Sequence, residues 1–524
     1  MASNCRMEVE GKNCSMLQGK EGVMKFWREK ERTEEEKQLY KRAQNWQIAL
    51  FTLSSGAGMA FYILMAYVSY IANAGYGITV AVTGVIMTAT RMFDGFTDPI
   101  VALLVDRLNT RFGKIRILMW LGWGIESLAC LIMYVFGSNG EHGIVFFIIA
   151  YMLYIIGYTL YGVSTNIVGP VMTNDPKQRP VLGRWQTIYS YLFPTILNMG
   201  IAMYVLPKYG NKYNIPMLRE ICIYAIIFAA LMTLLASIGV SAFDKRENFI
   251  SFSMEKKEEK KIGTKDMWKL IRSNHAFQTY IISSAADKLA LSTGSQSVVS
   301  IMFYGILIGN IQLSAIFSLI SMVPAIIFLF IATGVAARKG NKESMIIWTK
   351  ASLIAASGII VFCSVTDMST ITRAAIPTVI FFGLMIIYNG FKMGVSACTG
   401  SMMSDIVDYE MSRTSSFMPG VVAATYSFVD KLISSLSSTI AAFCVALIGF
   451  KTVMPQPKDE ATTPIFIMTM ILMFGFPILG WICSIVAMKF YPLTKEKMID
   501  VQRENKKLRG TVQEIVVQQE ATME

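Results

Sequence analysis

Residues 90–116 read TRMFDGFTDPIVALLVDRLNTRFGKIR, and this stretch decides how the chain is interpreted. It is apolar enough to enter a membrane, yet it carries Arg91, Asp94 and Asp98. A charged side chain at the centre of a bilayer costs about 2.5–3.5 kcal/mol even on the lenient insertion scale. The three charges are spaced i, i+3 and i+7, so a helix places them on one stripe. We therefore expect this stripe to face the protein interior or a water-filled cavity.

Two readings of the stripe remain open from the residues alone. Two carboxylates one turn apart, with hydroxyls nearby, supply hard oxygen ligands for Na⁺ or can share a proton. The stripe sums to −1, so it also suits a basic partner. Alternatively, Arg91 and Asp94 form a salt bridge that only packs helices together.

The composition of the whole chain predicts a membrane protein. Its 524 residues are 53% hydrophobic and 16% charged, with a mean hydropathy of +0.47, whereas a soluble protein is about 25% charged. Apolar runs of about 20 residues, the length of a spanning helix, recur throughout. We predict an all-α protein with twelve spans, at roughly 47–72, 77–105, 116–136, 143–172, 182–207, 219–243, 277–305, 311–336, 344–365, 373–404, 420–450 and 463–490.

The positive charge follows the predicted topology. The net charge is +12, but 37 of the 48 Lys and Arg residues lie in the tails and loops on one side of the spans. This is the positive-inside asymmetry. It argues against nucleic acid as a partner and predicts a multi-pass protein of the cell (cytoplasmic) membrane with both termini cytoplasmic.

A charged segment divides the chain into two halves. Residues 244–276 include EKKEEKK at 255–261 and read as a cytoplasmic linker. A weak repeat supports the division, because R-x-G-K at 111–114 and R-x-G-x-K at 338–342 each follow the second span of a half. Parallel halves are typical of transporters. The predicted units are a tail (1–46), a six-helix bundle (47–243), the linker (244–276), a second six-helix bundle (277–490) and a tail (491–524).

The remaining composition argues against an enzyme and against a bound cofactor. The eight cysteines are scattered without metal or disulfide spacing, and the chain has only two histidines, His142 and His275. No GxSxG or Walker-type loop is present. Residues 1–45 are polar and charged, so we expect no cleaved signal peptide.

Further charges lie within the predicted spans. Asp287–Lys288 and Asp430–Lys431 are adjacent pairs, so at most one residue of each pair faces a given cavity. Lys431 lies deep in a helix of small residues (DKLISSLSSTIAAF). Glu126 and Lys392 are either interhelical partners or lie nearer an interface than the spans suggest.

Two clusters of opposite charge lie at the cytoplasmic ends of spans two and ten. DRLNTRFGKIR (106–116) is basic, whereas SDIVDYE (404–410) is acidic on a side where acid is uncommon. We predict that they form a cytoplasmic gate between the halves; the alternative for the basic loop is ordinary positive-inside charge. The residues assigned to the gate are Arg91, Asp106, Arg111, Arg116, Asp405 and Asp408.

These motifs resemble the glycoside–pentoside–hexuronide:cation symporters, the melibiose-carrier branch of the major facilitator superfamily. RMFDGFTDPIVALLVDRLNTRFGKIR is similar to the family signature R-x-x-D-x-x-x-D-P…D-x…R-x-G-K/R, and the resemblance covers nearly all of residues 45–490. It implies a major facilitator fold with no cofactor beyond a coupling ion. It implies a cation site of Asp94, Asp98, Thr159 and Lys431, with the two aspartates as ligands if the ion is Na⁺. It also implies solute contacts from Arg184, Trp185, Asn166 and Lys431.

The sequence departs from the melibiose branch at the sugar contacts. Gly58 and Gly162 stand where that branch has sugar-binding aspartates, and Asn166 replaces a tryptophan. A site built to bind sugar hydroxyls needs such polar groups to discriminate. The solute is therefore a glycoside, a glucuronide-like conjugate or an amphipathic organic anion such as a lysolipid-like or steroid-conjugate compound.

The sequence thus predicts a Na⁺- or H⁺-driven symporter of a small organic solute that works as a monomer by alternating access. The competing interpretations are a membrane enzyme, a transporter-like sensor and a channel. The first lacks a catalytic constellation. The second is disfavoured by the intact coupling carboxylates, and the third by the complementary gate charges.

Overall fold

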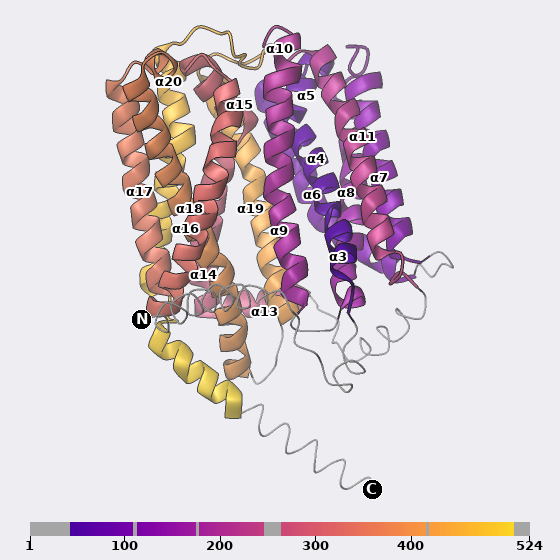
Figure 1. The fold of residues 1–524 in the computed structure, drawn as a ribbon, viewed down its shortest axis with the longest axis vertical. Coiled ribbons are helices and arrows are strands. Elements are labelled where there is room, and N and C mark those ends of the chain that lie inside the picture. Colours follow the sequence, from indigo (N-terminus) through magenta and orange to yellow (C-terminus); the bar gives the residue numbers. More distant parts are fainter. Residues whose placement is uncertain (1–41, 108–112, 174–177, 246–263, 415–418, 508–524) are drawn as a thin grey trace, which may run out of the picture.

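The computed structural model describes residues 42–107, 113–173, 178–245, 264–414 and 419–507. Within these ranges the chain consists of helices and their connections, without strands. The helices stand roughly parallel and form two groups, which follow one another along the sequence (Figure 1). The prediction of an all-α protein is confirmed.

The first half begins with a span in three pieces and continues with five further helical segments. Its helices are α3 (Asn45–Thr52), α4 (Ser54–Ala66), α5 (Val68–Tyr76), α6 (Val80–Arg107), α7 (Ile115–Leu131), α8 (Ile144–Met172), α9 (Arg179–Gly200), α10 (Leu206–Lys208) and α11 (Ile215–Val240). Short π-helical turns extend α7 over Ile132–Phe136 and join α9 to α10 over Ile201–Val205.

The second half begins with a short helix that lies across the bundle axis (Figure 1). Its helices are α13 (Thr264–Ser273), α14 (His275–Gly294), α15 (Ser297–Ser300), α16 (Gln312–Lys339), α17 (Asn341–Val365), α18 (Ala375–Thr414), α19 (Pro419–Leu447), α20 (Thr463–Met470) and α21 (Phe476–Phe490). A π-helical segment (Ile301–Leu307) follows α15, a 3₁₀ turn (Met368–Thr372) precedes α18, and a π turn (Ile471–Gly475) joins α20 to α21.

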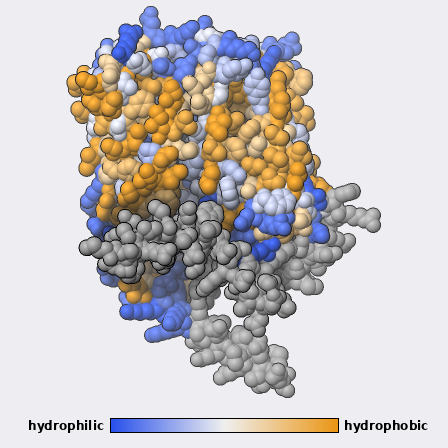
Figure 2. Space-filling view, in the orientation of Figure 1, coloured by the Kyte–Doolittle hydropathy of each residue, from blue (hydrophilic) through white to orange (hydrophobic). Residues whose placement is uncertain are grey.

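The apolar surface identifies a multi-pass membrane protein. In the described part of the chain, ten helices are long and apolar enough to cross a membrane, and α14 with the segment 297–307, bent by 52°, is an eleventh candidate. The surface shows an apolar belt between two hydrophilic ends (Figure 2). The highly charged α6 is not among the ten or the bent pair, so twelve spans agree with the structure but stay a prediction.

The two ends of the bundle can be named from the chain. The helix α3 begins, and α21 ends, at the same end of the bundle, which we call the terminal face (Figure 1). The other end is the opposite face. The topology prediction makes the terminal face cytoplasmic, and the five predicted units likewise stay a prediction.

Small residues allow the helices to approach closely. A Cβ on Gly157 of α8 would lie 2.6 Å from the backbone nitrogen of Glu126 on α7, and one on Gly122 would lie 2.7 Å from that of Tyr161. Such close backbone approach is the usual way in which helices pack within membranes. It fixes α8 against α7 and so sets the position of the polar residues of α8.

Candidate functional site

Asp94 of α6 is the centre of the candidate site. Its Oδ1 accepts a hydrogen bond of 2.9 Å from Thr159 Oγ1 on α8, and its Oδ2 lies 3.1 Å from Lys431 Nζ on α19. Thr159 belongs to the first half and Lys431 to the second. One carboxylate therefore contacts both halves of the protein.

The α6–α19 contact that presents Lys431 to Asp94 is held by small and hydroxylated residues. Thr88 Oγ1 donates to the Ser435 carbonyl oxygen at 2.8 Å, and Thr439 Oγ1 donates to the Gly84 carbonyl oxygen at 3.0 Å. A Cβ on Gly84 would lie 2.5 Å from the Cβ of Ala442. The two helices thus touch over several turns, from Gly84 to Asp94.

A cavity of about 180 Å³ adjoins Asp94. Four tyrosines form much of its wall, together with Arg91, Met65, Ile155 and Ser434; the tyrosines are Tyr62, Tyr151, Tyr154 and Tyr158. The rings of Tyr151, Tyr154 and Tyr158 stack along α8, with centroids 6.0 and 6.2 Å apart. Their spacing of three and four residues places them on one helical face, a pattern that is visible in the sequence but carries no charge.

Arg91 lines this cavity beside Asp94, and its assignment to the cytoplasmic gate stays a prediction. Its guanidinium interacts with the Tyr151 hydroxyl and with the electrostatic field of Tyr62. Sixteen residues separate Arg91 from Arg107, where α6 ends, which is about 24 Å of helix. The i, i+3 spacing placed Arg91 on the stripe of Asp94 but gave no measure of its depth.

Oxygen atoms suited to a coupling cation come from Asp94 and Thr159. A carboxylate and a hydroxyl are hard ligands, and the ammonium of Lys431 lies beside Asp94 Oδ2. In the described residues no group of three or more His, Cys, Asp or Glu side chains could hold a metal ion. The predicted second ligand, Asp98, has a side chain outside the described residues, as do Asn166, Asp106 and Arg111.

The predicted solute residues of α9 lie outside the tyrosine-lined cavity. Arg184 is exposed, and Trp185 is half-buried with its ring 5.5 Å from that of Tyr189. A Cβ on Gly58 or Gly162 would meet no atom within 4 Å, so both positions face open space. The two glycines that distinguish this chain from the melibiose branch therefore leave room where that branch has carboxylates.

Arg116 of the basic loop pairs within its own half. Its Nε lies 3.1 Å from Asp244 Oδ2, just beyond the end of α11. The buried Asp244 carboxylate also accepts backbone hydrogen bonds of 2.8–3.0 Å from Lys114, Ile115 and Arg116. Asp244 thus fixes the start of α7, a role that the sequence analysis did not foresee.

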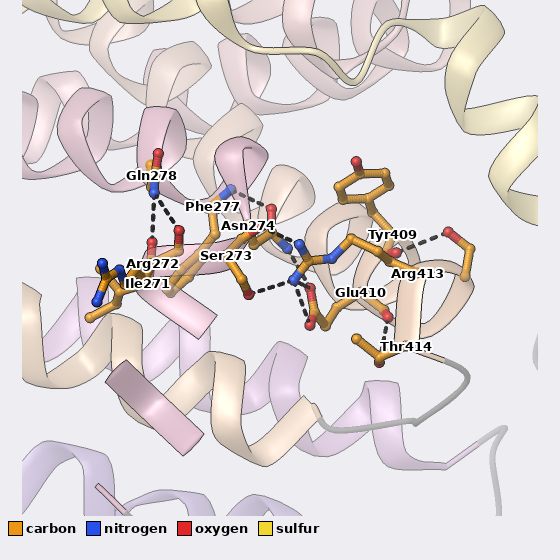
Figure 3. A network of polar contacts seen from close by, with 11 residues as sticks. Ile271, Arg272, Ser273, Asn274, Phe277, Gln278, Tyr409, Glu410, Arg413 and Thr414 are labelled. Atoms are coloured by element: carbon orange, nitrogen blue, oxygen red, sulfur yellow. Dashed lines mark hydrogen bonds and ion pairs between the residues drawn. The ribbon is translucent and has the colours of Figure 1, made fainter. Parts of the chain in front are cut away.

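The acidic motif of α18 also has partners in the second half. Asp405 Oδ2 accepts from Asn341 Nδ2 at 2.6 Å, and Asp408 Oδ2 accepts from Gln502 Nε2 at 2.7 Å. Glu410 binds Arg413 and Asn274. Arg413 in turn donates to Ser273 at the end of α13. Glu410 and Arg413 therefore anchor α13 to the end of α18 (Figure 3).

The two halves are bonded to one another at the opposite face. Asn73 Nδ2 donates to the Thr452 carbonyl oxygen at 2.7 Å, and Asn73 Oδ1 accepts from the Met454 backbone at 3.1 Å. The Tyr70 hydroxyl donates to the Pro455 carbonyl oxygen at 2.8 Å. We call these three contacts the opposite-face lock.

A polytopic bundle of two halves, with one carboxylate that contacts both, is typical of transport proteins. The family described as "MFS/sugar transport protein" matches residues 49–495. The chain therefore belongs to the MFS/sugar transport protein family. This confirms the predicted family and its major facilitator class.

Curated relatives span most of the chain at low identity. The "Glucuronide carrier protein homolog" of Escherichia coli (strain K12) is 23% identical over 86% of this chain and 92% of its own. The "Isoprimeverose transporter" of Lactiplantibacillus pentosus is 21% identical over 85% and 88%. The "Uncharacterized symporter YjmB" of Bacillus subtilis (strain 168) is 22% identical over 76% and 81%.

Solved structures show the same fold. The nucleoside transporter NupG superimposes with a TM-score of 0.54 at 12% identity, over 86% of this chain and all of that chain. A bacterial homologue of the iron transporter ferroportin gives a TM-score of 0.57 at 12% identity, over 86% of this chain and 98% of its own.

Proposed function

We propose that the protein is a cation-coupled symporter that moves a small sugar derivative by alternating access. The observation that carries this proposal is the position of Asp94 between Thr159 of the first half and Lys431 of the second. A cation bound at Asp94 competes with Lys431, so binding changes the contact between the halves. Such a differential contact is what allows a ligand to shift a conformational equilibrium.

The solute class is supported by the names of the relatives and by the site. The relatives include a glucuronide carrier homologue and an isoprimeverose transporter, which favours a glycoside or uronide over a lysolipid-like solute. The open space at Gly58 and Gly162 lacks the carboxylates that would bind a neutral sugar's hydroxyls. Arg184 and Lys431 are the cationic side chains that would bind an acidic sugar.

The gate prediction becomes part of this proposal. The opposite-face lock describes a state that is closed at that face. When the protein turns over, the loop at 106–116 and the acidic motif at 404–410 approach and close the terminal face. Charge reversal at Arg111 should then favour the state open to the terminal face, and reversal at Asp408 should partly restore closure. If cysteine accessibility from the terminal face is unchanged in both variants, the gate prediction is wrong.

Uptake into proteoliposomes tests the function. Vesicles that contain the purified protein, and no solute inside, are offered a labelled panel of neutral glycosides, glucuronides and lysolipids, with a Na⁺ gradient, a proton gradient or neither. We expect accumulation of a sugar derivative that requires one of the two gradients and is lost in Asp94→Cys. Gradient-independent equilibration of every panel member would instead identify a uniporter.

A further inference from the structure

Three acid–base pairs form a ladder through the membrane-spanning helices. Lys431 pairs with Asp94 at 3.1 Å, and Lys288 Nζ lies 3.6 Å from Asp430 Oδ2. Beyond them, Asp287 and Lys392 are electrostatic neighbours, without a direct ion pair among the described residues. Since Asp430 and Asp287 are each followed by the lysine of another pair, the ladder joins α6, α19, α14 and α18 in that order. It leads from the candidate cation site to a carboxylate deep in the second half.

The last two residues of this ladder, Asp287 and Lys392, form no direct ion pair, whereas the other two pairs do. Asp287 is 7% exposed, and its Oδ1 has no hydrogen-bond partner among the described residues. The fully buried Trp481 interacts with this carboxylate through its indole N–H, but without the geometry of a regular hydrogen bond. The ammonium of Lys392 lies 5.0 Å from the centre of the Tyr388 ring, and no ion pair within 4.0 Å joins it to Asp287 in the described chain.

An open buried pair is not what helix packing alone requires. Charges removed from water are costly, and the cost is offset only when geometry is good and the remaining polar atoms are satisfied. If the pair served only to hold α14 to α18, a direct ion pair between Asp287 and Lys392 would stabilise the protein more. Asp287 therefore has an oxygen without a regular hydrogen bond among the described residues. Its charge is only partly compensated, which is the arrangement expected of a group that changes its protonation state.

The groups around Asp287 select a proton over a metal ion. The neighbouring helices α18, α21 and α19 present ionisable or donor groups, and α14 adds the next lysine; these groups are Lys392, Tyr388, Trp481, Tyr426, Asp430 and Lys288. An ammonium and an indole N–H can only donate hydrogen bonds. A metal ion would thus find one carboxylate beside a fixed positive charge, whereas a proton needs only one carboxylate oxygen.

We propose that Asp287 is a second ion site, in the second half, that takes up a proton and releases it during the transport cycle. The proton comes from water, adds to a carboxylate oxygen to form the neutral acid, and returns to water, while Lys392 stays an ammonium. Lys392 is half-buried, whereas Asp287 is buried. The role in the cycle rests on the proposed symport, but the protonation does not.

The charges of the ladder also determine the sign of the coupling between cation binding at Asp94 and proton binding at Asp287. A cation at Asp94 and a proton at Asp287 each add one positive charge to a ladder that is neutral without them. Like charges oppose one another, so cation binding at Asp94 should favour proton release from Asp287. Linkage requires the converse as well: protonation of Asp287 weakens cation binding at Asp94 by the same factor.

Infrared difference spectroscopy tests the protonation without any solute. The full-length protein in liposomes is compared between about pH 5 and about pH 9, a range in which buried carboxyls with shifted titration are found. We expect a carboxylic C=O band that is lost in Asp287→Asn and kept in Asp94→Asn. Ser283→Ala is the matched control, because Ser283 lies one turn away on α14 and bonds only Ser484 across to α21 among described residues.

The outcomes separate this proposal from the proposed function. Absence of a titrating band in the wild type, or an unchanged band in Asp287→Asn, overturns the proton site whatever the transport assays show. If Asp287→Asn fails to fold, Asp287→Asn/Lys392→Met removes the unpaired charge and takes its place. Loss of the band in these variants together with uncoupled transport in the wild type supports the site and contradicts symport.

Discussion

Lys431 Nζ lies 3.1 Å from Asp94 Oδ2, and this ion pair crosses from the second half of the protein to the first. The side chain of Asp94 is 14% exposed and that of Lys431 is 33% exposed, so water reaches the pair. The pair is thus accessible to an ion that enters from solution. In the proposed cycle, a cation that displaces the ammonium would remove this contact between the halves.

Replacing Asp94 by Asn should abolish gradient-driven accumulation while the protein remains folded and inserted. The amide keeps the size of the side chain and loses the charge that attracts the cation. Uptake with and without a gradient measures the effect. Asp500→Asn is the control, because Asp500 is an exposed carboxylate with an exposed partner, Arg503. Normal accumulation in Asp94→Asn would remove the cation assignment.

Thr159→Val should weaken cation binding without affecting folding. The hydroxyl donates to Asp94 Oδ1 at 2.9 Å and can also offer its oxygen to the ion. Hydrogen bonds to charged groups contribute about 1.5–3 kcal/mol, so the cation concentration for half-maximal uptake should rise about tenfold or more. Thr159→Ser keeps the hydroxyl and should behave as wild type. Equal cation affinity in both variants would show that the hydroxyl is not a ligand.

Lys431→Gln should distinguish acidic from neutral solutes. Two unit charges about 4 Å apart interact by about 4 kcal/mol at an effective dielectric of 20, and partial exposure reduces this. At saturating cation we expect the affinity for a glucuronide to fall about tenfold and that for a neutral glycoside to stay within about twofold. If the preferred solutes are neutral, or if glucuronide affinity is unchanged, Lys431 serves the cation site alone.

Asn73→Ala should open the opposite face. It removes the hydrogen bonds to Thr452 and Met454, and the loss of such buried partners costs about 1–3 kcal/mol. A cysteine introduced at Tyr62 in the cavity should then react faster, by about tenfold, with an impermeant reagent added at the opposite face. Asn389→Ala is the control, because the Asn389 amide bonds the Met385 carbonyl of its own helix. Equal rates in both variants would show that the lock does not control access.

Asp244→Asn should lower the thermal stability of the protein and leave its affinity for solute largely unchanged. The carboxylate is buried and accepts three backbone hydrogen bonds and the Arg116 guanidinium. Loss of a buried ionic partner costs about 3–5 kcal/mol, and partial exposure of Arg116 reduces this. The unfolding temperature of the purified protein measures the change. A variant as stable as wild type would mean that the start of α7 is fixed by other contacts.

Hydropathy predicted the helices well because a spanning helix must be long and apolar whatever its neighbours are. Intramembrane charge likewise directed attention to Asp94 and Lys431, since such residues rarely face lipid. Depth and partner choice depend on how helices are turned against one another, which a single sequence does not encode locally. The sequence therefore did not show that Arg91 lines the cavity, and Asp244 was passed over as one more linker acid. The tyrosines of α8 were missed because aromatic residues are common on packed faces.

At Gly84, the contact between α6 and α19 leaves no space for a side chain. A single methyl group there would collide with Ala442 Cβ at 2.5 Å and with the Ser438 carbonyl oxygen at 2.9 Å. The two helices therefore touch at this point. Any larger residue would separate α6 from α19, so Gly84 sets how closely the two halves can approach beside the candidate cation site.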